Sequence, residues 1–337
     1  MDRIAFIIGE TFLYWNSIIL TLAVASAICL FLFLYLREKK NGIAAAFLIC
    51  GCLVTGIVFS RAVHWYCMAN AYENLQAALT TYTGGGYALM GVFAACALTA
   101  CVLRLLCIVR NLPFTFDCMA LAGGAGIALG RLACLFTASD RGPVVESLRI
   151  FPIVYPVANS VTGVVEWRFA TFMIQAIVTG IIVLALFVFH LLGQRGMPRK
   201  LRDGDTACLF LCFYGASQVV LDSTRYDSLF MRSNGFISIV QILGAAALIL
   251  TFIYFSVRMV KARGFKRWYI PLWLAYAGCA GGAGFMEYWV QRHGDQAIFS
   301  YSVMTGCLAA MLVITCIVRL LAALQERKMA MVESAKI

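Results

Sequence analysis

The sequence predicts an all-α membrane protein, a polytopic bundle of helices that crosses the bilayer many times. Hydrophobic residues make up 62% of the 337 residues and charged residues only 13%, whereas soluble domains contain about 25% charged residues. The mean hydropathy is +0.87. One membrane domain accounts for the whole length. The N-terminus lacks the basic region and small-residue cleavage site of a signal peptide.

Nine apolar segments predict transmembrane helices, because a helix needs about 20 mostly apolar residues to cross the hydrocarbon. These segments are 12–36, 43–64, 87–109, 117–136, 169–193, 206–221, 236–257, 269–290 and 300–322. The connection 137–168 between the fourth and fifth spans contains three of the six prolines and alternates polar with β-branched residues. This pattern predicts a small extracytoplasmic cap with short strands.

The basic residues predict the orientation of the bundle. Of the 27 lysines and arginines, 18 follow the odd-numbered spans, and such residues concentrate in cytoplasmic loops. The N-terminus is therefore expected outside and the C-terminus in the cytoplasm. The remaining nine are all arginines: Arg3, Arg61, Arg131, Arg141, Arg149, Arg168, Arg225, Arg232 and Arg292. Basic residues confined to short loops exclude nucleic acid as a partner.

Arg131 is the most informative single residue. It lies in the apolar run 120–136, which would otherwise simply span the bilayer. A cation at membrane depth is costly and is usually kept for a function. A guanidinium suits a lipid phosphate because it can donate two hydrogen bonds at once. The alternative is that Arg131 lies near a helix end and reaches the interface.

Two further segments offer polar groups at the outer ends of the second and third spans. Arg61 and His64 end the second span, and the run Gly84–Gly86 opens the third. His64 could act as a general base, although a histidine beside Trp65 and Tyr66 also suits a membrane anchor. The glycines could cradle a phosphate with backbone N–H groups, or they could serve close helix packing.

The end of the sixth span carries a third polar segment. Gln218, Asp222 and Arg225 are spaced four and three residues apart, which predicts that they share one helix face beside an anionic ligand. The alternative is a helix-end ion pair between Asp222 and Arg225. The 14 cysteines lie mostly in apolar runs without the spacing of a zinc site, so we expect neither disulfides nor a metal.

Together these motifs resemble the bacterial prolipoprotein diacylglyceryl transferase family. The segment 126–136 resembles its signature, in which Gly-Arg leads into a small-Asn-Phe stretch. The segment 222–229 resembles its acidic-x-x-Arg-x-Asp-Ser-Leu motif. Order and spacing agree over about three quarters of the chain. The smaller matches are Trp15, Ser60-Arg61, Gly85-Gly86, Leu112-Pro113-Phe114, Asp117 and Gln241.

The resemblance implies a seven-helix transferase core at 1–262, with the cap at 137–168, followed by two additional helices and a cytoplasmic tail at 263–337. It implies transfer of a diacylglyceryl group from phosphatidylglycerol to the lipobox cysteine thiol of prolipoproteins. The reaction would take place at the outer face of the bacterial plasma (inner) membrane. The implied partners are phosphatidylglycerol and other membrane lipid, and the lipobox of the prolipoprotein signal peptide.

The resemblance also implies roles for individual residues, with no cofactor. The expected catalytic residues are Arg131 and Arg225, with His64 as a substitute for the thiol base that the family pattern places elsewhere. The expected phospholipid-binding residues are Arg61, Gly85, Gly86, Gly130, Gln218, Asp222 and Gln241.

The chain departs from the family pattern at several positions, including 169–175, where little of the family's His-Pro-Ser-Gln-Leu-Tyr-Glu motif survives. Met90 takes the place of a histidine and Gln218 that of an arginine, while Cys134 and Ser139 replace an asparagine and a glutamate. An alternative function is therefore a catalytically impaired paralogue that acts as a phospholipid-binding or scaffold protein. A transporter is disfavoured, because the spans contain neither an acidic relay nor a duplicated half.

Overall fold

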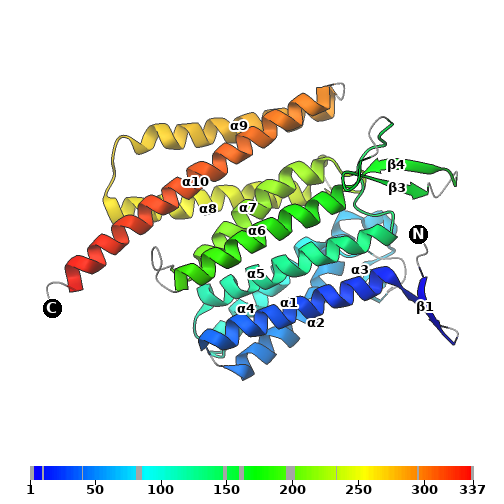
Figure 1. Ribbon diagram of the computed structural model, residues 1–337, viewed down its shortest axis with the longest axis horizontal. Coiled ribbons are helices and arrows are strands. Elements are labelled where there is room, and N and C mark those ends of the chain that lie inside the picture. The colour runs from blue at the N-terminus through cyan, green and yellow to red at the C-terminus, as the bar shows by residue number, and fades with distance from the viewer. Residues whose placement is uncertain are drawn as a thin grey trace. The chain divides into compact units, whose positions relative to one another are not determined.

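The computed structural model describes residues 4–9, 11–39, 41–80, 86–146, 150–158, 163–194, 202–232, 234–293 and 296–334. Ten α-helices dominate these residues (Figure 1). The helices are α1 (Trp15–Lys39), α2 (Gly42–Cys67), α3 (Leu75–Thr80), α4 (Leu89–Leu105), α5 (Leu112–Arg131), α6 (Thr171–Gln194), α7 (Asp205–Ser223), α8 (Ile239–Arg263), α9 (Tyr269–Arg292) and α10 (Ala297–Ser334).

Short strands and 3-10 turns connect several of these helices. The strands pair as three two-stranded antiparallel sheets within the described residues. They are β1 (Ile4–Ile8), β2 (Thr11–Tyr14), β3 (Val154–Ala158), β4 (Val165–Phe169), β5 (Phe230–Met231) and β6 (Asn234–Ser238). The 3-10 turns are η1 (Ala69–Ala71) and η2 (Leu132–Phe136).

The predicted all-α membrane bundle is confirmed. Each predicted span coincides with a helix, and seven of these helices are long and apolar enough to cross a membrane. The other two are α4, which has 17 residues, and α9, which has 24 but is not among the seven. The number of nine spans therefore stays a prediction.

The sequence supplies caps where two of the helices begin. Oδ1 of Asn41 accepts a hydrogen bond from the N–H of Ala44 at 3.1 Å, at the start of α2. Oδ1 of Asn111 accepts one from the N–H of Phe114 at 3.2 Å, at the start of α5. Each bond satisfies an N–H group that has no partner inside its helix. Pro113 fits the first turn of α5 because it has no N–H group to satisfy.

The chain divides into two compact units. The first comprises Met1–Val188, Arg202–Phe210 and Thr224–Val240, and the second comprises Phe189–Leu201, Leu211–Ser223 and Gln241–Ile337. This division does not follow the predicted boundary between 1–262 and 263–337. The division into compact units does not show which unit carries an activity. The assignment of a transferase core to 1–262 therefore stays a prediction.

In the first unit, α1 packs along α5 and α2 packs along α4. The closest approach lies where α4 begins beside the last turns of α2. A Cβ atom on Gly91 would collide with the carbonyl oxygen of Phe59 and lie 2.6 Å from the Cα of Ser60. The N–H of Ala88 also donates to the carbonyl of Ser60 at 3.1 Å. Glycine is therefore required at position 91 for α4 to start against α2.

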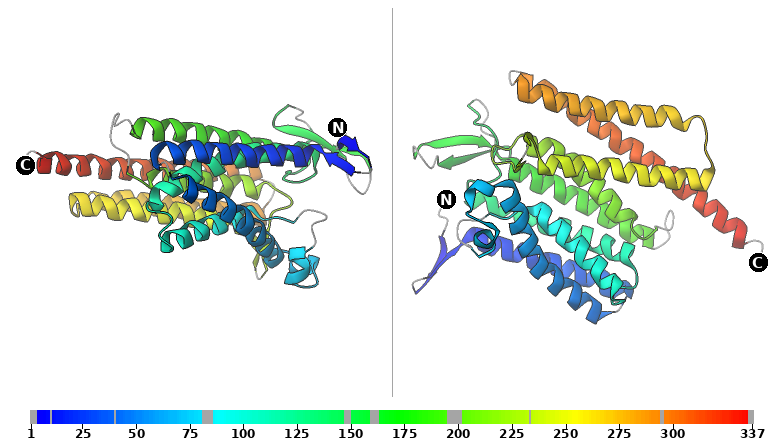
Figure 2. Two further views of the ribbon diagram at one scale, coloured as in Figure 1. Left: turned by 90° about the horizontal axis from the view of Figure 1, so that it is seen from below. Right: turned by 180° about the vertical axis from the view of Figure 1, so that it is seen from behind.

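The predicted cap contains strands, as expected. Strands β3 and β4 form an antiparallel hairpin in which Val154 pairs with Phe169 and Ala158 with Val165. Residues 142–145 add a short edge, since the N–H of Gly142 donates to the Phe169 carbonyl and the N–H of Val145 donates to the Trp167 carbonyl, both at 2.8 Å. The hairpin β1–β2 was not predicted. Both hairpins lie at the same end of the first unit (Figures 1 and 2).

In the second unit, α9 and α10 pack against each other. The ring of Phe252 on α8 stacks on the ring of Tyr276 on α9, with centroids 3.7 Å apart and planes 4° apart. Gly215 on α7 meets Gly244 on α8 so closely that an added Cβ would lie 2.7 Å from the Gly244 carbonyl oxygen. Small residues at this crossing let the two backbones touch, as is common between membrane helices.

Asp117 joins α5 to the beginning of α7. This carboxylate is fully buried, and its two oxygens accept hydrogen bonds from the N–H groups of Gly204 and Ala207, both at 2.7 Å. The first N–H groups of a helix carry partial positive charge, so a carboxylate is favourable there. Asp117 therefore fixes where α7 starts relative to α5.

We expect Asp117→Ala to lower the free energy of unfolding by about 1–3 kcal/mol, because it leaves two buried N–H groups without an acceptor. Thermal unfolding of the purified protein in detergent measures the effect. Glu73→Ala is the matched control, because Glu73 is exposed and should change the stability by less than about 0.5 kcal/mol. Equal effects of the two substitutions would contradict the capping role of Asp117.

Candidate functional site

Two arginines and two aspartates form one connected group in the first unit, the arginine–aspartate cluster (Arg131, Asp140, Arg225 and Asp227). Arg131 ends α5, and its Nη1 pairs with Oδ2 of Asp140. Nη2 of Arg225 pairs with Oδ1 of the same carboxylate. Nε of Arg225 donates to Oδ1 of Asp227 at 3.1 Å. One carboxylate therefore holds both arginines that the sequence predicted as catalytic.

The backbone closes this cluster into a ring. The N–H of Asp140 donates to Oδ2 of Asp227 at 2.9 Å, and the carbonyl of Asp140 accepts from the N–H of Phe172 at 3.0 Å. Asp140 has a φ of 57°, a left-handed conformation that aspartate tolerates better than most residues. An unusual backbone geometry held by hydrogen bonds on both sides is frequent at functional sites.

The cluster is largely shielded from solvent. The exposed fractions of the side chains of Arg131, Asp140 and Arg225 are 16%, 10% and 11%. Burial by itself raises the pKa of the Asp140 carboxyl, but the charges of Arg131 and Arg225 outweigh it and lower the pKa to about 2. Asp140 is therefore negative at any physiological pH, and the pairs persist.

The thiol of Cys134 also belongs to this site. Its Sγ donates to Oδ2 of Asp140 at 3.2 Å, on the oxygen that Arg131 binds. A thiol is a weak hydrogen-bond donor. It therefore adds a contact to the carboxylate without competing strongly with the guanidinium.

Arg61 and His64 form a second group at the end of α2. Arg61 is buried, and it donates through Nε to the Ala78 carbonyl and through Nη1 to the Gly86 carbonyl, both at 2.9 Å. Its guanidinium lies 4.9 Å from the ring centroid of Tyr87. These contacts hold α3 and the segment that leads into α4 against α2. The role of Arg61 in phosphate binding stays a prediction.

Gly86 is packed tightly into the same group. Its φ is +90°, and an added Cβ would collide with the Tyr72 hydroxyl and lie 2.7 Å from Nη1 of Arg61 and 3.2 Å from Cε1 of His64. Nδ1 of His64 in turn lies 3.1 Å from the Tyr72 hydroxyl. Both the conformation and the space therefore require glycine at position 86. Gly85, its predicted neighbour in phosphate binding, lies outside the described residues.

Gly130 has no such tight surroundings. An added Cβ would lie 3.7 Å from Leu20 and 3.8 Å from Ala23 on α1, which is ordinary van der Waals contact. The phospholipid-binding role of Gly130 stays a prediction.

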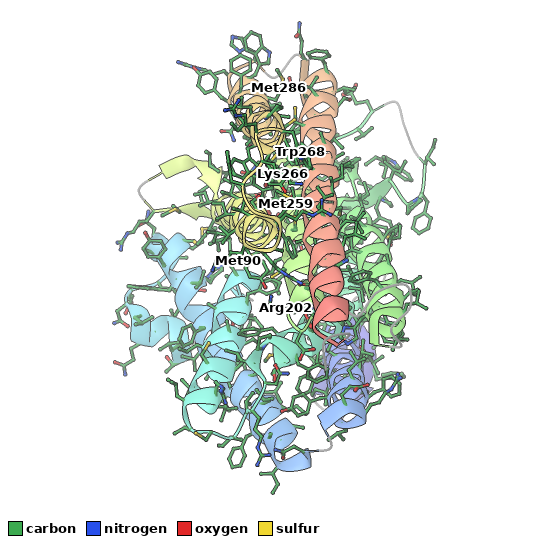
Figure 3. The ribbon with its side chains drawn as sticks, turned by 90° about the vertical axis from the view of Figure 1, so that its left-hand side faces the viewer. Met90, Arg202, Met259, Lys266, Trp268 and Met286 are labelled. Atoms are coloured by element: carbon green, nitrogen blue, oxygen red, sulfur yellow. The ribbon has the colours of Figure 1, made fainter. Side chains whose placement is uncertain are left out.

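Met90, where the family pattern has histidine, lies in the first turn of α4 (Figure 3).

The sixth-span residues are not arranged as predicted. Gln218 and Asp222 lie on α7 and are buried, but the helix ends at Ser223, so Arg225 belongs to the loop that follows. The prediction that Arg225 shares one helix face with them was wrong, because the chain leaves the helix before completing that turn. Gln241 is buried in the second unit, where its Nε2 donates to the Val219 carbonyl at 3.1 Å.

Sequence reasoning missed the two residues that organise the cluster, Asp140 and Asp227. Both were visible as acidic residues close to predicted arginines, Asp140 shortly after Arg131 and Asp227 directly after Arg225-Tyr226. A search for carboxylates able to neutralise each outer arginine would have found them. It also missed Arg141, which the structure buries next to Asp140.

No three histidine, cysteine, aspartate or glutamate side chains are grouped as metal ligands would be in the ranges that the structure describes. The expectation of a reaction without metal or cofactor stays an expectation.

A family model described as prolipoprotein diacylglyceryl transferase matches residues 3–256. The chain belongs to this family. The matched range contains the whole arginine–aspartate cluster as well as Arg61 and His64. A search of the curated proteins gives no match.

Membership of the prolipoprotein diacylglyceryl transferase family indicates that this chain is a transferase. Family members are membrane-embedded transferases of lipoprotein biosynthesis, acting on a phospholipid and a prolipoprotein. Two guanidinium groups held in fixed positions offer N–H donors to a charge that develops on a phosphate. Their planar geometry suits oxygen atoms in pairs.

We expect Asp140→Asn to reduce the free energy of unfolding at pH 7 by about 3 kcal/mol, because it leaves Arg131 and Arg225 without their shared charge. Asparagine keeps the size of the side chain and tolerates the left-handed backbone. Glu146→Gln is the control, since Glu146 is exposed in the same cap.

The effect of Asp140→Asn should depend on pH in a defined direction. The folded-state pKa of about 2 lies below the unfolded value of about 3.9, so the charge stabilises the fold fully above about pH 5. This contribution is lost as the pH falls from about 4 towards 2. The stability difference between wild type and variant should therefore be constant from pH 5 to 8 and shrink below pH 4. A difference that varies between pH 5 and 8 would refute the assignment.

Proposed function

We propose that this chain transfers the diacylglyceryl group of phosphatidylglycerol to the lipobox cysteine of prolipoproteins, at the outer face of the bacterial plasma membrane. The observation that carries the proposal is the shared pairing of Arg131 and Arg225 with Asp140. These arginines come from two separate motifs that resemble the family's. Their convergence on one carboxylate supports a single phosphate-binding centre.

In this reaction the cysteine sulfur attacks the glyceryl carbon that bears the phosphate. The bond between that carbon and the phosphate oxygen breaks, and glycerol phosphate leaves with the bonding electrons. Negative charge grows on the leaving phosphate, and the donors of Arg131 and Arg225 stabilise it in the transition state. Asp140 holds both guanidinium groups in place, so that little reorganisation is needed during the step.

The thiol proton also needs an acceptor. We propose His64 for this role, because its ring lies beside the Tyr72 hydroxyl and close to Arg61 and Gly86. Positive charge near the acceptor thiol would lower the pKa of the thiol and assist the same step. Arg61, Gly86, Gln218, Asp222 and Gln241 are proposed to contact the phospholipid, together with Gly85 and Gly130.

A second candidate is a phospholipid-binding or scaffold protein that has lost part of the catalytic machinery. Met90 favours it, because a thioether can neither take a proton at neutral pH nor donate a hydrogen bond. Gln218 favours it too, since it removes one positive charge relative to the family pattern. The two candidates share the phosphate site and differ in whether transfer occurs.

The proposed orientation has the N-terminus outside and the C-terminus in the cytoplasm, and the site opens sideways to the membrane so that a diacylated lipid enters with its tails in hydrocarbon. The distribution of lysine and arginine supports this orientation. A reporter fused after Lys336 should be active in the cytoplasm. Activity on the outer side would refute the orientation.

Complementation tests the proposed function. Expressed in bacteria depleted of their own transferase, the wild-type chain should restore lipid attachment to prolipoproteins, measured by the gel mobility of a reporter lipoprotein. Arg131→Lys should reduce this activity about 30-fold or more, because lysine cannot reproduce paired hydrogen bonds from a planar group. Arg292→Lys, an exposed change on α9, should leave it unchanged. Absence of lipid attachment with wild type, despite normal expression, would favour the scaffold.

Met90→His tests whether the missing imidazole limits the rate. General acid–base catalysis is typically worth about 10²–10⁴-fold, so the variant should transfer diacylglyceryl groups to a lipobox peptide at least about tenfold faster than wild type. Met90→Gln, which adds a polar group without a titratable nitrogen, is the control. No gain from histidine would mean that another group already serves as the base.

A further inference from the structure

Arg141 is a buried, charged residue of the cap that the proposed mechanism does not use. It follows Asp140, and its side chain is 1% exposed. Its backbone is fixed on both sides: its carbonyl accepts from the N–H of Tyr226 at 3.1 Å, and the next residue, Gly142, donates to the Phe169 carbonyl at 2.8 Å. The side chain is therefore held in the cap by the main chain around it.

The guanidinium of Arg141 lies between aromatic rings. Its Cζ is 5.0 Å from the ring centroid of Tyr155 on β3 and 5.0 Å from that of Phe172 on α6. Nη2 donates to the carbonyls of Cys134 and Thr137 at 3.1 and 2.9 Å. Nε and Nη1 are buried and have no hydrogen-bond partner among the described residues. Aromatic faces stabilise the charge, but they leave these two N–H donors unused.

The charges around Arg141 do not balance. Asp140 and Asp227 are taken by Arg131 and Arg225, and Glu166 pairs with Arg168 at 2.8 Å. Within the described part of this region, each of these three carboxylates pairs with an arginine other than Arg141. Burial lowers the pKa of Arg141, and the charge of Arg168 acts in the same direction.

A buried guanidinium without a counter-charge is unfavourable unless an anion completes it. The arginine–aspartate cluster cannot supply the missing charge, because its two arginines and two aspartates are neutral together. We propose that Nε and Nη1 of Arg141 bind a phosphate, either in the donor lipid or in the glycerol phosphate that leaves it. The inference rests on the proposed function, since it assigns the phosphate of that reaction to a named residue.

The Tyr155 ring covers the guanidinium of Arg141, so a phosphate reaches the two donors only when this ring moves aside. Arg141 then provides a net positive charge beside two arginines that are already neutralised by Asp140 and Asp227. Specificity for a phosphate over an uncharged head group follows from this excess charge.

The test measures binding and requires no transfer. The purified full-length protein in detergent is unfolded thermally over a series of inorganic phosphate and glycerol phosphate concentrations, with chloride at equal ionic strength as reference. A ligand that binds the folded state raises the unfolding temperature. Wild type should be stabilised by phosphate. Arg141→Gln should raise the dissociation constant for phosphate by at least about 30-fold. Arg232→Gln, an exposed change, should bind phosphate as wild type does.

A second arm separates the two sources of phosphate. Phosphatidylglycerol is compared with diacylglycerol, which has the same tails and no phosphate. Stabilisation of wild type by glycerol phosphate identifies the leaving group as the ligand, and stabilisation by phosphatidylglycerol alone identifies the lipid head group. Either result supports the proposal if Arg141→Gln abolishes it.

Equal stabilisation of wild type and Arg141→Gln, or no stabilisation of wild type by any of the three phosphate compounds, would overturn the assignment. The second of these outcomes is decided by wild type alone, without the variant. Phosphate binding without restored lipid attachment would refute the transferase and leave the role of Arg141 standing.

Discussion

The carboxylate of Asp140, held between Arg131 and Arg225, is the contact on which the candidate site depends. It brings the end of α5 and the loop after α7 to one point. A membrane-embedded arginine is tolerated only with a partner, and here one aspartate serves two. Each oxygen of the carboxylate pairs with one guanidinium. If either guanidinium moved away, a buried charge would be left unpaired in apolar surroundings.

The same contact ties the cap to the helices. Asp140 sits between η2 and Arg141, its carbonyl accepts from the first turn of α6, and its N–H reaches Asp227. The β3–β4 hairpin is joined to this segment through Gly142. Movement of the cap is therefore linked to the positions of the arginines, which gives a physical route by which an entering lipid could alter the site.

The fold was predictable from the sequence to a larger extent than the site. Apolar length identifies a spanning helix locally, so each predicted span coincides with one, and the Gly-Arg motif pointed to Arg131. The partners of Arg131 could not be predicted in this way, because Asp140 comes after a 3-10 turn and itself adopts a left-handed conformation, which no periodicity encodes. The helical spacing of Gln218, Asp222 and Arg225 gave a wrong prediction. The spacing is helical as far as Arg225, but the helix ends at Ser223.

A double-mutant cycle between Arg131 and Asp140 tests the central claim most directly. The free energy of unfolding is measured for wild type, Arg131→Gln, Asp140→Asn and the double variant. Strong coupling is expected, with the double variant losing less stability than the sum of the single losses by at least about 1 kcal/mol. Strictly additive losses would contradict it, because they would mean that Asp140 does not hold Arg131 in place.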